Sequence, residues 1–284
     1  MEKQAIGIFD SGIGGLTVLK ELRQRLPNER LIYFGDTARI PYGSKSKKLV
    51  QQYALEDAAF LLQHNVKMIV VACNTASAMA IDVLTERLKV PVVGVVIPGS
   101  VGAIRETKKN VIGVIGTSAT ISSNAYAQAI KSNSPQEINV YSQACPLLVP
   151  LVEEGWLEEQ VTVLTLENYL KEILETKVDT LILGCTHYPL LHDTVQKVTG
   201  PNVKLVDSGS ETARFVENVL IQNNLLNKGA KEDDDLFFVS DIPQKFEEIG
   251  SRFLGGPFKN IKRIDFEEFL MSNSDEIKKL IYAV

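Results

Sequence analysis

The chain has 284 residues, of which 45% are hydrophobic and 23% are charged, and its formal net charge is −5 at pH 7. At this length one hydrophobic core gives way to two lobes, and the composition is ordinary for a soluble globular enzyme. The negative charge argues against a polyanionic partner such as nucleic acid. The densest basic run (Lys45, Lys47 and Lys48) shares a predicted helix with Glu56 and Asp57, so we interpret it as a solvated helix face.

The start of the chain and its cysteines predict a cytoplasmic protein. An apolar strand pattern begins within a few residues, and no cleavable signal pattern precedes it. No apolar stretch is long enough to span a bilayer, so we expect no membrane contact. The three cysteines, Cys73, Cys145 and Cys185, form no CxxC motif and no disulfide framework, which indicates thiols kept for chemistry or packing.

Strand and helix patterns alternate along the first third of the chain. We expect a strand over residues 5–10, a helix near 16–26, a strand over 31–35, a loop over 36–43, a helix from Ser44 to about Gln63, the strand that leads to Cys73, a helix to about Leu88, and a strand over 91–96. This alternation predicts an α/β fold with a mainly parallel sheet and helices on both faces.

Two segments of the chain end in the same way. Residues 66–73 and 178–185 align without a gap, and each runs an apolar stretch into a cysteine, Cys73 or Cys185. Such a stretch is typical of a buried parallel strand. Because chemistry in open α/β sheets lies beyond the carboxyl ends of the strands, the pattern predicts two thiols in equivalent places.

The match between the two cysteine segments extends to other strands. Residues 111–117 resemble residues 6–11, and residues 203–207 resemble residues 92–96. Three matches in the same order indicate an internal duplication. We therefore expect two pseudo-symmetric α/β lobes with the active site in the cleft between them.

The lobes are expected to have unequal shares of the chain. Residues 1–97 with 208–284 form the first lobe, which includes a C-terminal return, and residues 98–207 form the second. After Asp207 the pattern predicts a helix over 211–226, an acidic loop over 231–235, a strand over 236–239 and further helices. We expect this tail to pack back on the first lobe.

A single cysteine after an apolar run is most simply a packing residue. Two in equivalent positions, each followed by polar residues, favour chemistry instead. Asn74 or Thr75 can cap a helix after Cys73, and Thr186 with Pro189 indicates a helix start after Cys185. A helix N-terminus stabilises a thiolate, lowering its pKa from about 8.5, and can also hold a substrate carboxylate.

Two thiols facing one carbon are suited to inversion at that carbon. One thiolate removes the proton while a thiol returns a proton to the opposite face. An ordinary thiol pKa of about 8.5 allows both protonation states near working pH, where general acid–base catalysis is most effective.

Neighbouring polar residues have both a structural and a catalytic interpretation. Asp10 ends the first predicted strand and can either cap the next helix or position protons near Cys73. His187 can bind a backbone carbonyl or assist the nearby Cys185. Glu153 is an exposed acid or a cleft residue, and Cys145, which has no counterpart in the duplication, is assigned to packing.

Cofactor and metal alternatives fit the sequence less well. A dinucleotide loop beginning at Gly12 and Gly14 would place its third glycine at Thr17, although Asp36 lies where a ribose-binding acid is expected. A zinc site of Cys73, Cys185 and His187 matches no standard spacing. No lysine ends an apolar strand, which disfavours pyridoxal phosphate. We expect no cofactor and no metal.

Five motifs in this chain resemble those of the glutamate racemase family, within the aspartate/glutamate racemase superfamily. They are GIFDSGIGG at 7–15, DTARIPYG at 36–43, ACNTAS at 72–77, GCTHYP at 184–189 and VDS at 206–208. They occur in the family's order, and the combination is specific although any one alone is not.

The resemblance implies cofactor-independent interconversion of L- and D-glutamate, which supplies D-glutamate for peptidoglycan. It implies that Cys73 serves the D-enantiomer and Cys185 the L-enantiomer, with Asp10 and His187 assisting and Glu153 near His187. The implied substrate-binding residues are Asp10, Ser11, Tyr42, Gly43, Asn74, Thr75, Thr117, Thr120, Thr186 and His187. A homodimer is also implied.

The residues alone leave other functions open. The same fold could racemise aspartate or another small acid. Alternatively, a two-lobed protein could bind an amino acid without turning it over, with both cysteines serving only in packing.

Overall fold

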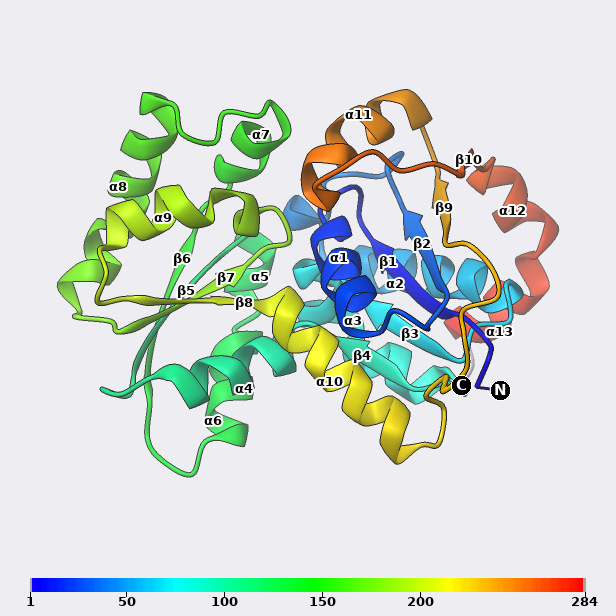
Figure 1. The fold of residues 1–284 in the computed structure, drawn as a ribbon, viewed down its shortest axis with the longest axis horizontal. Coiled ribbons are helices and arrows are strands. Elements are labelled where there is room, and N and C mark those ends of the chain that lie inside the picture. Colours follow the sequence, from blue (N-terminus) through cyan, green and yellow to red (C-terminus); the bar gives the residue numbers. More distant parts are fainter. Residues whose placement is uncertain (1, 283–284) are drawn as a thin grey trace.

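The computed structural model of the chain describes residues 2–282 (Figure 1). The strands are β1 (Ile6–Asp10), β2 (Leu31–Gly35), β3 (Met68–Val71), β4 (Val92–Gly94), β5 (Val111–Gly116), β6 (Asn139–Ala144), β7 (Thr180–Gly184), β8 (Lys204–Asp207), β9 (Leu236–Val239) and β10 (Ile261–Arg263). The α-helices are α1 (Leu16–Arg25), α2 (Lys47–Gln63), α3 (Asn74–Arg87), α4 (Val96–Glu106), α5 (Ser118–Ser122), α6 (Ala125–Asn133), α7 (Leu148–Glu153), α8 (Gln160–Glu175), α9 (His192–Thr199), α10 (Ser208–Gln222), α11 (Pro243–Leu254), α12 (Phe266–Ser272) and α13 (Ser274–Tyr282). Two short 3₁₀ turns are η1 (Tyr42–Ser44) and η2 (Tyr188–Leu191).

The strands form two separate parallel sheets, which confirms the predicted α/β fold class. One sheet has the order β10-β9-β2-β1-β3-β4 and the other β6-β5-β7-β8, and every neighbouring pair is parallel. The order β2-β1-β3-β4 in the first sheet matches β6-β5-β7-β8 in the second. The sequence matches noted above therefore fall on equivalent strands: β1 with β5, β3 with β7 and β4 with β8.

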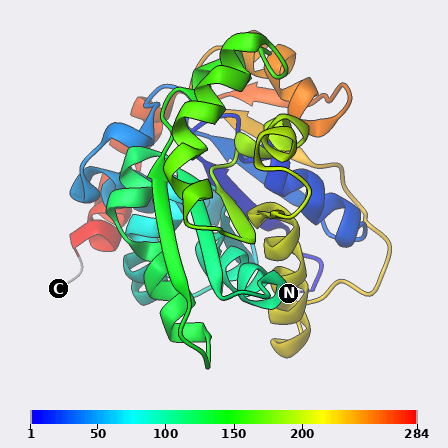
Figure 2. The same cartoon turned by 90° about the vertical axis from the view of Figure 1, so that its left-hand side faces the viewer.

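Apolar strands are buried on both faces because helices cover both sides of each sheet. In β1, Ile6 and Ile8 pack into the cluster that contains α1, whereas Phe9 points to the opposite cluster with α2 and α3. This alternation follows from the two-residue period of a strand. Figure 2 turns the second sheet toward the viewer and shows helices on either side of its green strands.

The chain passes between the two sheets twice, from β4 to α4 and from β8 to α10. Helices α4 and α10 pack against each other, and α10 also packs against α1, so it lies between the two halves (Figure 1). The C-terminal part of the chain adds two strands to the first sheet, since β9 pairs with β2 and β10 pairs with β9.

No helix within residues 2–282 is both long and apolar enough to cross a bilayer. Helix α2 begins later than the sequence predicts, because Tyr42–Ser44 form the turn η1 and Ser46 rather than Ser44 caps the helix. The basic run is exposed at Lys47 and Lys48, as the sequence predicts, whereas Glu56 and Asp57 further along α2 are buried.

Candidate active site

A cavity of about 390 Å³ lies where the carboxyl ends of strands from both sheets meet. The predicted site residues that line it are Ser11, Tyr42, Gly43, Cys73, Asn74, Thr75, Thr117, Glu153, Cys185, Thr186 and His187. Cys73 follows β3 and Cys185 directly follows β7, its counterpart in the second sheet. One thiol from each half of the molecule therefore reaches the same cavity.

Cys73 is itself the N-cap of α3, rather than being followed by a capping Asn74 or Thr75. Its Sγ accepts a hydrogen bond from the backbone N–H of Ala76 at 3.5 Å and lies 3.7 Å from Ser11 Oγ. Burial and the charge of Asp10 raise the pKa of Cys73 to about 12, although the hydrogen bonds from Ala76 and Ser11 act in the opposite direction. The lowered pKa expected for a helix N-terminus is therefore absent here, because desolvation outweighs the helix.

Cys185 belongs to a chain of contacts that ends at an acid. Its Sγ lies 3.9 Å from His187 Nδ1, and His187 Nε2 lies 3.1 Å from Glu153 Oε1. Burial alone lowers the pKa of His187, but the hydrogen bonds to Cys185 and Glu153 outweigh it and raise this pKa to about 10. The imidazole is therefore protonated at neutral pH and can exchange a proton with the thiol.

Asp10 lies behind the cavity wall on the Cys73 side. It is buried, and its Oδ2 accepts a hydrogen bond from the backbone N–H of Gly12 at 2.9 Å. It does not cap α1, whose N-cap is Gly15. Burial raises the pKa of Asp10, whereas the charge of His187 and nearby backbone N–H groups act to lower it.

Three threonine hydroxyls join the two halves at the floor of the site. Thr75 Oγ1 lies 2.9 Å from Thr117 Oγ1 and 3.2 Å from Thr120 Oγ1, and the latter two are 2.9 Å apart. Thr75 belongs to α3, and the other two stand at the start of α5. Thr120 does not line the cavity, so it contacts the site through its two neighbours.

Sequence reasoning missed the apolar wall of the cavity and the residues behind Asn74. The wall includes Ile13, Ile40, Pro146, Val149 and Pro150. Asn74 Nδ2 donates to Tyr126 Oη at 2.7 Å, and Tyr126 Oη lies 3.0 Å from Ser208 Oγ. Ser208 was visible as part of a motif, but nothing in the sequence distinguishes Tyr126 from a core residue.

Cys145 is buried and does not line the cavity, and its Sγ lies 3.6 Å from the carbonyl oxygen of Gln143. These contacts are those of a packing residue. Within residues 2–282, no group of three or more His, Cys, Asp or Glu side chains is arranged to hold a metal ion.

Comparison with known proteins gives a consistent result. Residues 13–216 match the family described as Asp/Glu/hydantoin racemase. The chain is 51% identical over 267 residues to a glutamate racemase from Geobacter metallireducens, covering 94% of this chain and 98% of the relative. A glutamate racemase from Neisseria meningitidis is 49% identical over 263 residues, covering 92% and 97%.

Solved structures agree in fold. The structure of a glutamate racemase from Francisella tularensis in complex with D-glutamate has a TM-score of 0.87 and 40% identity, covering 94% of this chain and all of that one. One from Bacillus anthracis has a TM-score of 0.89 and 39% identity, covering 93% and 98%.

Proposed function

The chain belongs to the Asp/Glu/hydantoin racemase family, and on that premise we propose that Cys73 and Cys185 racemise glutamate by proton transfer at Cα. The enzyme is an isomerase that interconverts L- and D-glutamate, and the supply of D-glutamate for peptidoglycan is the known role of this family. The observation that carries the mechanism is the opening of both thiols, from equivalent strand ends, into one cavity.

In each turnover a thiolate takes the α-proton from one face of the substrate, and the opposite thiol gives its proton to the other face. The thiolate becomes a thiol and the thiol becomes a thiolate, so the protons balance. The enzyme can then convert the opposite enantiomer, or the two cysteines exchange protons with solvent and return to their starting states. Cys73 acts on D-glutamate and Cys185 on L-glutamate. No cofactor or metal takes part.

The assisting groups differ on the two sides. His187, held by Glu153, exchanges a proton with Cys185. Asp10 is the buried acid whose charge acts on Cys73, and the hydroxyl of Ser11 lies 3.7 Å from the thiol. A general acid or base must lie within hydrogen-bond reach of the proton that it transfers.

The substrate is held by polar groups around the two thiols. Backbone N–H groups at the start of α3 and η2 suit a carboxylate, because helix N-termini favour anions. The proposed substrate-binding residues are Asp10, Ser11, Tyr42, Gly43, Asn74, Thr75, Thr117, Thr120, Thr186 and His187. We also propose a cytoplasmic homodimer, with lobes formed by residues 1–97 plus 208–284 and by residues 98–207.

The mechanism is tested by proton NMR of the purified protein with D- or L-glutamate in D₂O. Wild type is expected to racemise glutamate and exchange its α-proton, and Cys73→Ala and Cys185→Ala are each expected to lose racemisation. Residual exchange of a single enantiomer in each variant would assign the faces. Cys145→Ala is the matched control and is expected to racemise like wild type, because Cys145 lies outside the cavity.

Racemisation that survives either cavity variant would contradict the two-thiol mechanism. Bound glutamate whose α-proton never exchanges in the wild type would support a binding protein instead. Aspartate in the same assay tests the neighbouring activity, and dialysis against a chelator is expected to leave the rate unchanged.

A further inference from the structure

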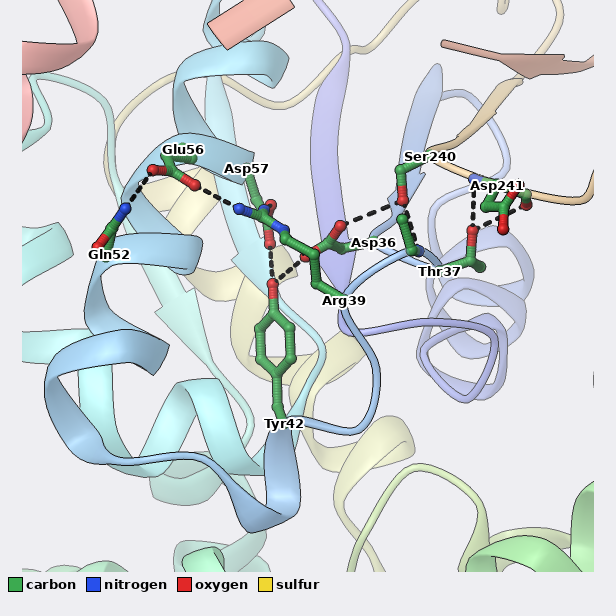
Figure 3. A network of polar contacts seen from close by, with 10 residues as sticks. Asp36, Thr37, Arg39, Tyr42, Gln52, Glu56, Asp57, Ser240 and Asp241 are labelled. Carbon is green, nitrogen blue, oxygen red and sulfur yellow. Dashed lines mark hydrogen bonds and ion pairs between the residues drawn. The ribbon is translucent and has the colours of Figure 1, made fainter. Parts of the chain in front are cut away.

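A buried polar cluster holds the loop that carries Tyr42 and Gly43 (Figure 3). Asp36 follows β2, Arg39 and Tyr42 belong to the loop, and Glu56 and Asp57 project from α2. The side chains of Asp36 and Asp57 are completely buried, and that of Arg39 is 18% exposed. Three acids thus surround one guanidinium, so the cluster has a net negative charge if all three are ionised. Such a charge is costly to bury unless one of the acids keeps its proton.

Of the acids in this cluster, Asp36 has the most hydrogen-bond donors. Its Oδ2 accepts from Arg39 Nε at 2.6 Å and from Tyr42 Oη at 2.5 Å. Its Oδ1 lies 3.2 Å from Ser240 Oγ, which accepts from the N–H of Ala38 at 2.9 Å and so directs its own hydrogen to Asp36. Burial raises the pKa of Asp36, but the three donors that converge on its carboxyl group act against this rise and stabilise the anion.

Asp57 has fewer donors. Its Oδ1 accepts from Arg39 Nη2 at 2.8 Å, and its Oδ2 lies 3.0 Å from Tyr42 Oη. The phenol has one hydrogen, and the shorter contact directs it to Asp36. With both acids ionised, Asp57 Oδ2 and the phenol oxygen would face each other at this distance with no hydrogen between them.

Glu56 does not take this proton. It pairs with Arg39 Nη1 and accepts from Gln52 Nε2 at 2.9 Å, so its two oxygens have donors. The guanidinium of Arg39 also lies 4.0 Å from the ring centroid of Tyr53 and 4.7 Å from that of Phe266. These cation–π contacts stabilise the charged group in this position.

We propose that Asp57 is a buried neutral acid that donates its hydrogen to Tyr42 Oη, and that it thereby acts as a positioning residue for the substrate loop. The hydrogens then run in one direction, from Asp57 to Tyr42 to Asp36. Burial and the charge of Asp36 raise the pKa of Asp57 well above its usual value, in agreement with this order.

The cluster reaches the cavity through Tyr42. Tyr42 lines the cavity together with Pro41 and Gly43. Gly43 packs so closely on the second lobe that an added Cβ would lie 2.9 Å from Thr117 Cβ. A shift of the phenol would therefore move the backbone next to the substrate. This inference rests on the proposed function, because it assigns the loop to glutamate binding.

The test compares Asp57→Asn with Asp36→Asn in the purified enzyme. The amide in Asp57→Asn can accept from Arg39 and donate to Tyr42, as the neutral acid does, so KM for glutamate is expected to stay within about twofold of wild type. In Asp36→Asn an NH₂ group must face a donor, so KM is expected to rise about tenfold or more, with a smaller change in kcat. Isotope-edited infrared spectroscopy is expected to show a protonated carboxyl band in wild type that weakens in Asp57→Asn.

The reverse pattern, with Asp36→Asn tolerated and KM raised in Asp57→Asn, would place the proton on Asp36 and overturn the assignment. Failure of Asp57→Asn to fold, or an unchanged infrared band, would also overturn it. Wild type in the same assay separates the two proposals. Absence of racemisation in wild type would refute the proposed function, whereas the infrared difference and calorimetric glutamate binding would still test the proton on Asp57.

Discussion

The two thiols hold equivalent strand-end positions but have different neighbours. Cys73 lies beside Ser11, with the buried Asp10 nearby, whereas Cys185 faces the imidazole of His187. The second residue after Cys73 is Thr75, which binds hydroxyls, and the second after Cys185 is His187. The matching strand order therefore explains where the two thiols lie, and the residues next to them explain why the surroundings of the two thiols differ.

Replacing Glu153 with Gln tests the acid behind His187. The hydrogen bond and charge of Glu153 both raise the pKa of His187, so their loss lowers that pKa from about 10. The imidazolium then deprotonates at lower pH, and the alkaline decline of kcat is expected to begin at lower pH than in wild type. A pH profile of kcat for the L-to-D and the D-to-L conversion measures this shift. We also expect kcat/KM to fall about tenfold, because a charged hydrogen bond is lost.

Glu154→Gln is the matched control, because Glu154 is the exposed neighbour of Glu153 on the same turn. Its pH profile is expected to follow that of wild type. An alkaline limb that stays in place in Glu153→Gln would show that Glu153 does not set the proton affinity of His187.

At the scale of elements, a hydrogen-bond chain ties the Cys73 helix to the second sheet. It runs from Asn74 at the start of α3 through Tyr126 of α6 to Ser208 of α10, whose Oγ lies 3.5 Å from the carbonyl oxygen of Leu183 in β7. The carbonyl can only accept, so Ser208 donates to it, Tyr126 donates to Ser208, and the amide of Asn74 donates to Tyr126.

Tyr126→Phe removes the central hydroxyl of this chain and keeps the ring. Asn74 and Ser208 each lose a buried partner, at a cost of about 1–3 kcal/mol in unfolding free energy. KM for glutamate is expected to rise several-fold, because the Asn74 amide can then turn. Denaturant unfolding and steady-state kinetics test both effects. An unchanged KM alongside the stability loss would limit Tyr126 to a structural role.

The contact between β5 and β7 leaves no room at Gly184, the residue before Cys185. A Cβ there would lie 2.6 Å from the backbone oxygen of Ile115 and 3.1 Å from Tyr126 Cε2. Gly184→Ala is expected to lower the free energy of unfolding by about 1–3 kcal/mol. Each kcal/mol lost should lower the melting temperature by about 2–4 °C. Racemisation is expected to be lost, because the substitution displaces Cys185. Gly256→Ala, where a Cβ meets nothing within 4 Å, is the control and should melt like wild type.

The elements show where sequence reasoning succeeds and fails. The strands β2 and β9 were predicted to the residue, because apolar runs between turn residues mark their ends. β10 was not predicted, since Lys262 and Arg263 are exposed and its pairing with β9 depends on the tertiary fold. The burial of Asp57 was equally hidden, because only the folded loop brings Arg39 to that face of α2.

At the scale of the whole molecule, the matching strand order explains why the sequence could predict two thiols in equivalent places. Each half places its third strand beside its first, so β3 and β7 present Cys73 and Cys185 in the same way. The sequence could not predict how the halves face each other. That arrangement depends on contacts such as Thr75 with Thr117 and Asn74 with Tyr126, which join residues remote in the chain.

A cavity shared by both halves predicts joint protection of its two thiols. Alkylation requires the thiolate, and a pKa of about 12 keeps Cys73 mostly protonated at neutral pH, so its alkylation rate should rise about tenfold per pH unit below that value. Glutamate at a hundred times its dissociation constant is expected to slow labelling of Cys73 and Cys185 together by about a hundredfold. Peptide mass spectrometry after iodoacetamide treatment follows each cysteine separately. Cys145 is the internal control, because it lies outside the cavity and bound glutamate should not cover it. Protection of only one of the two cavity thiols would contradict a substrate that lies between both.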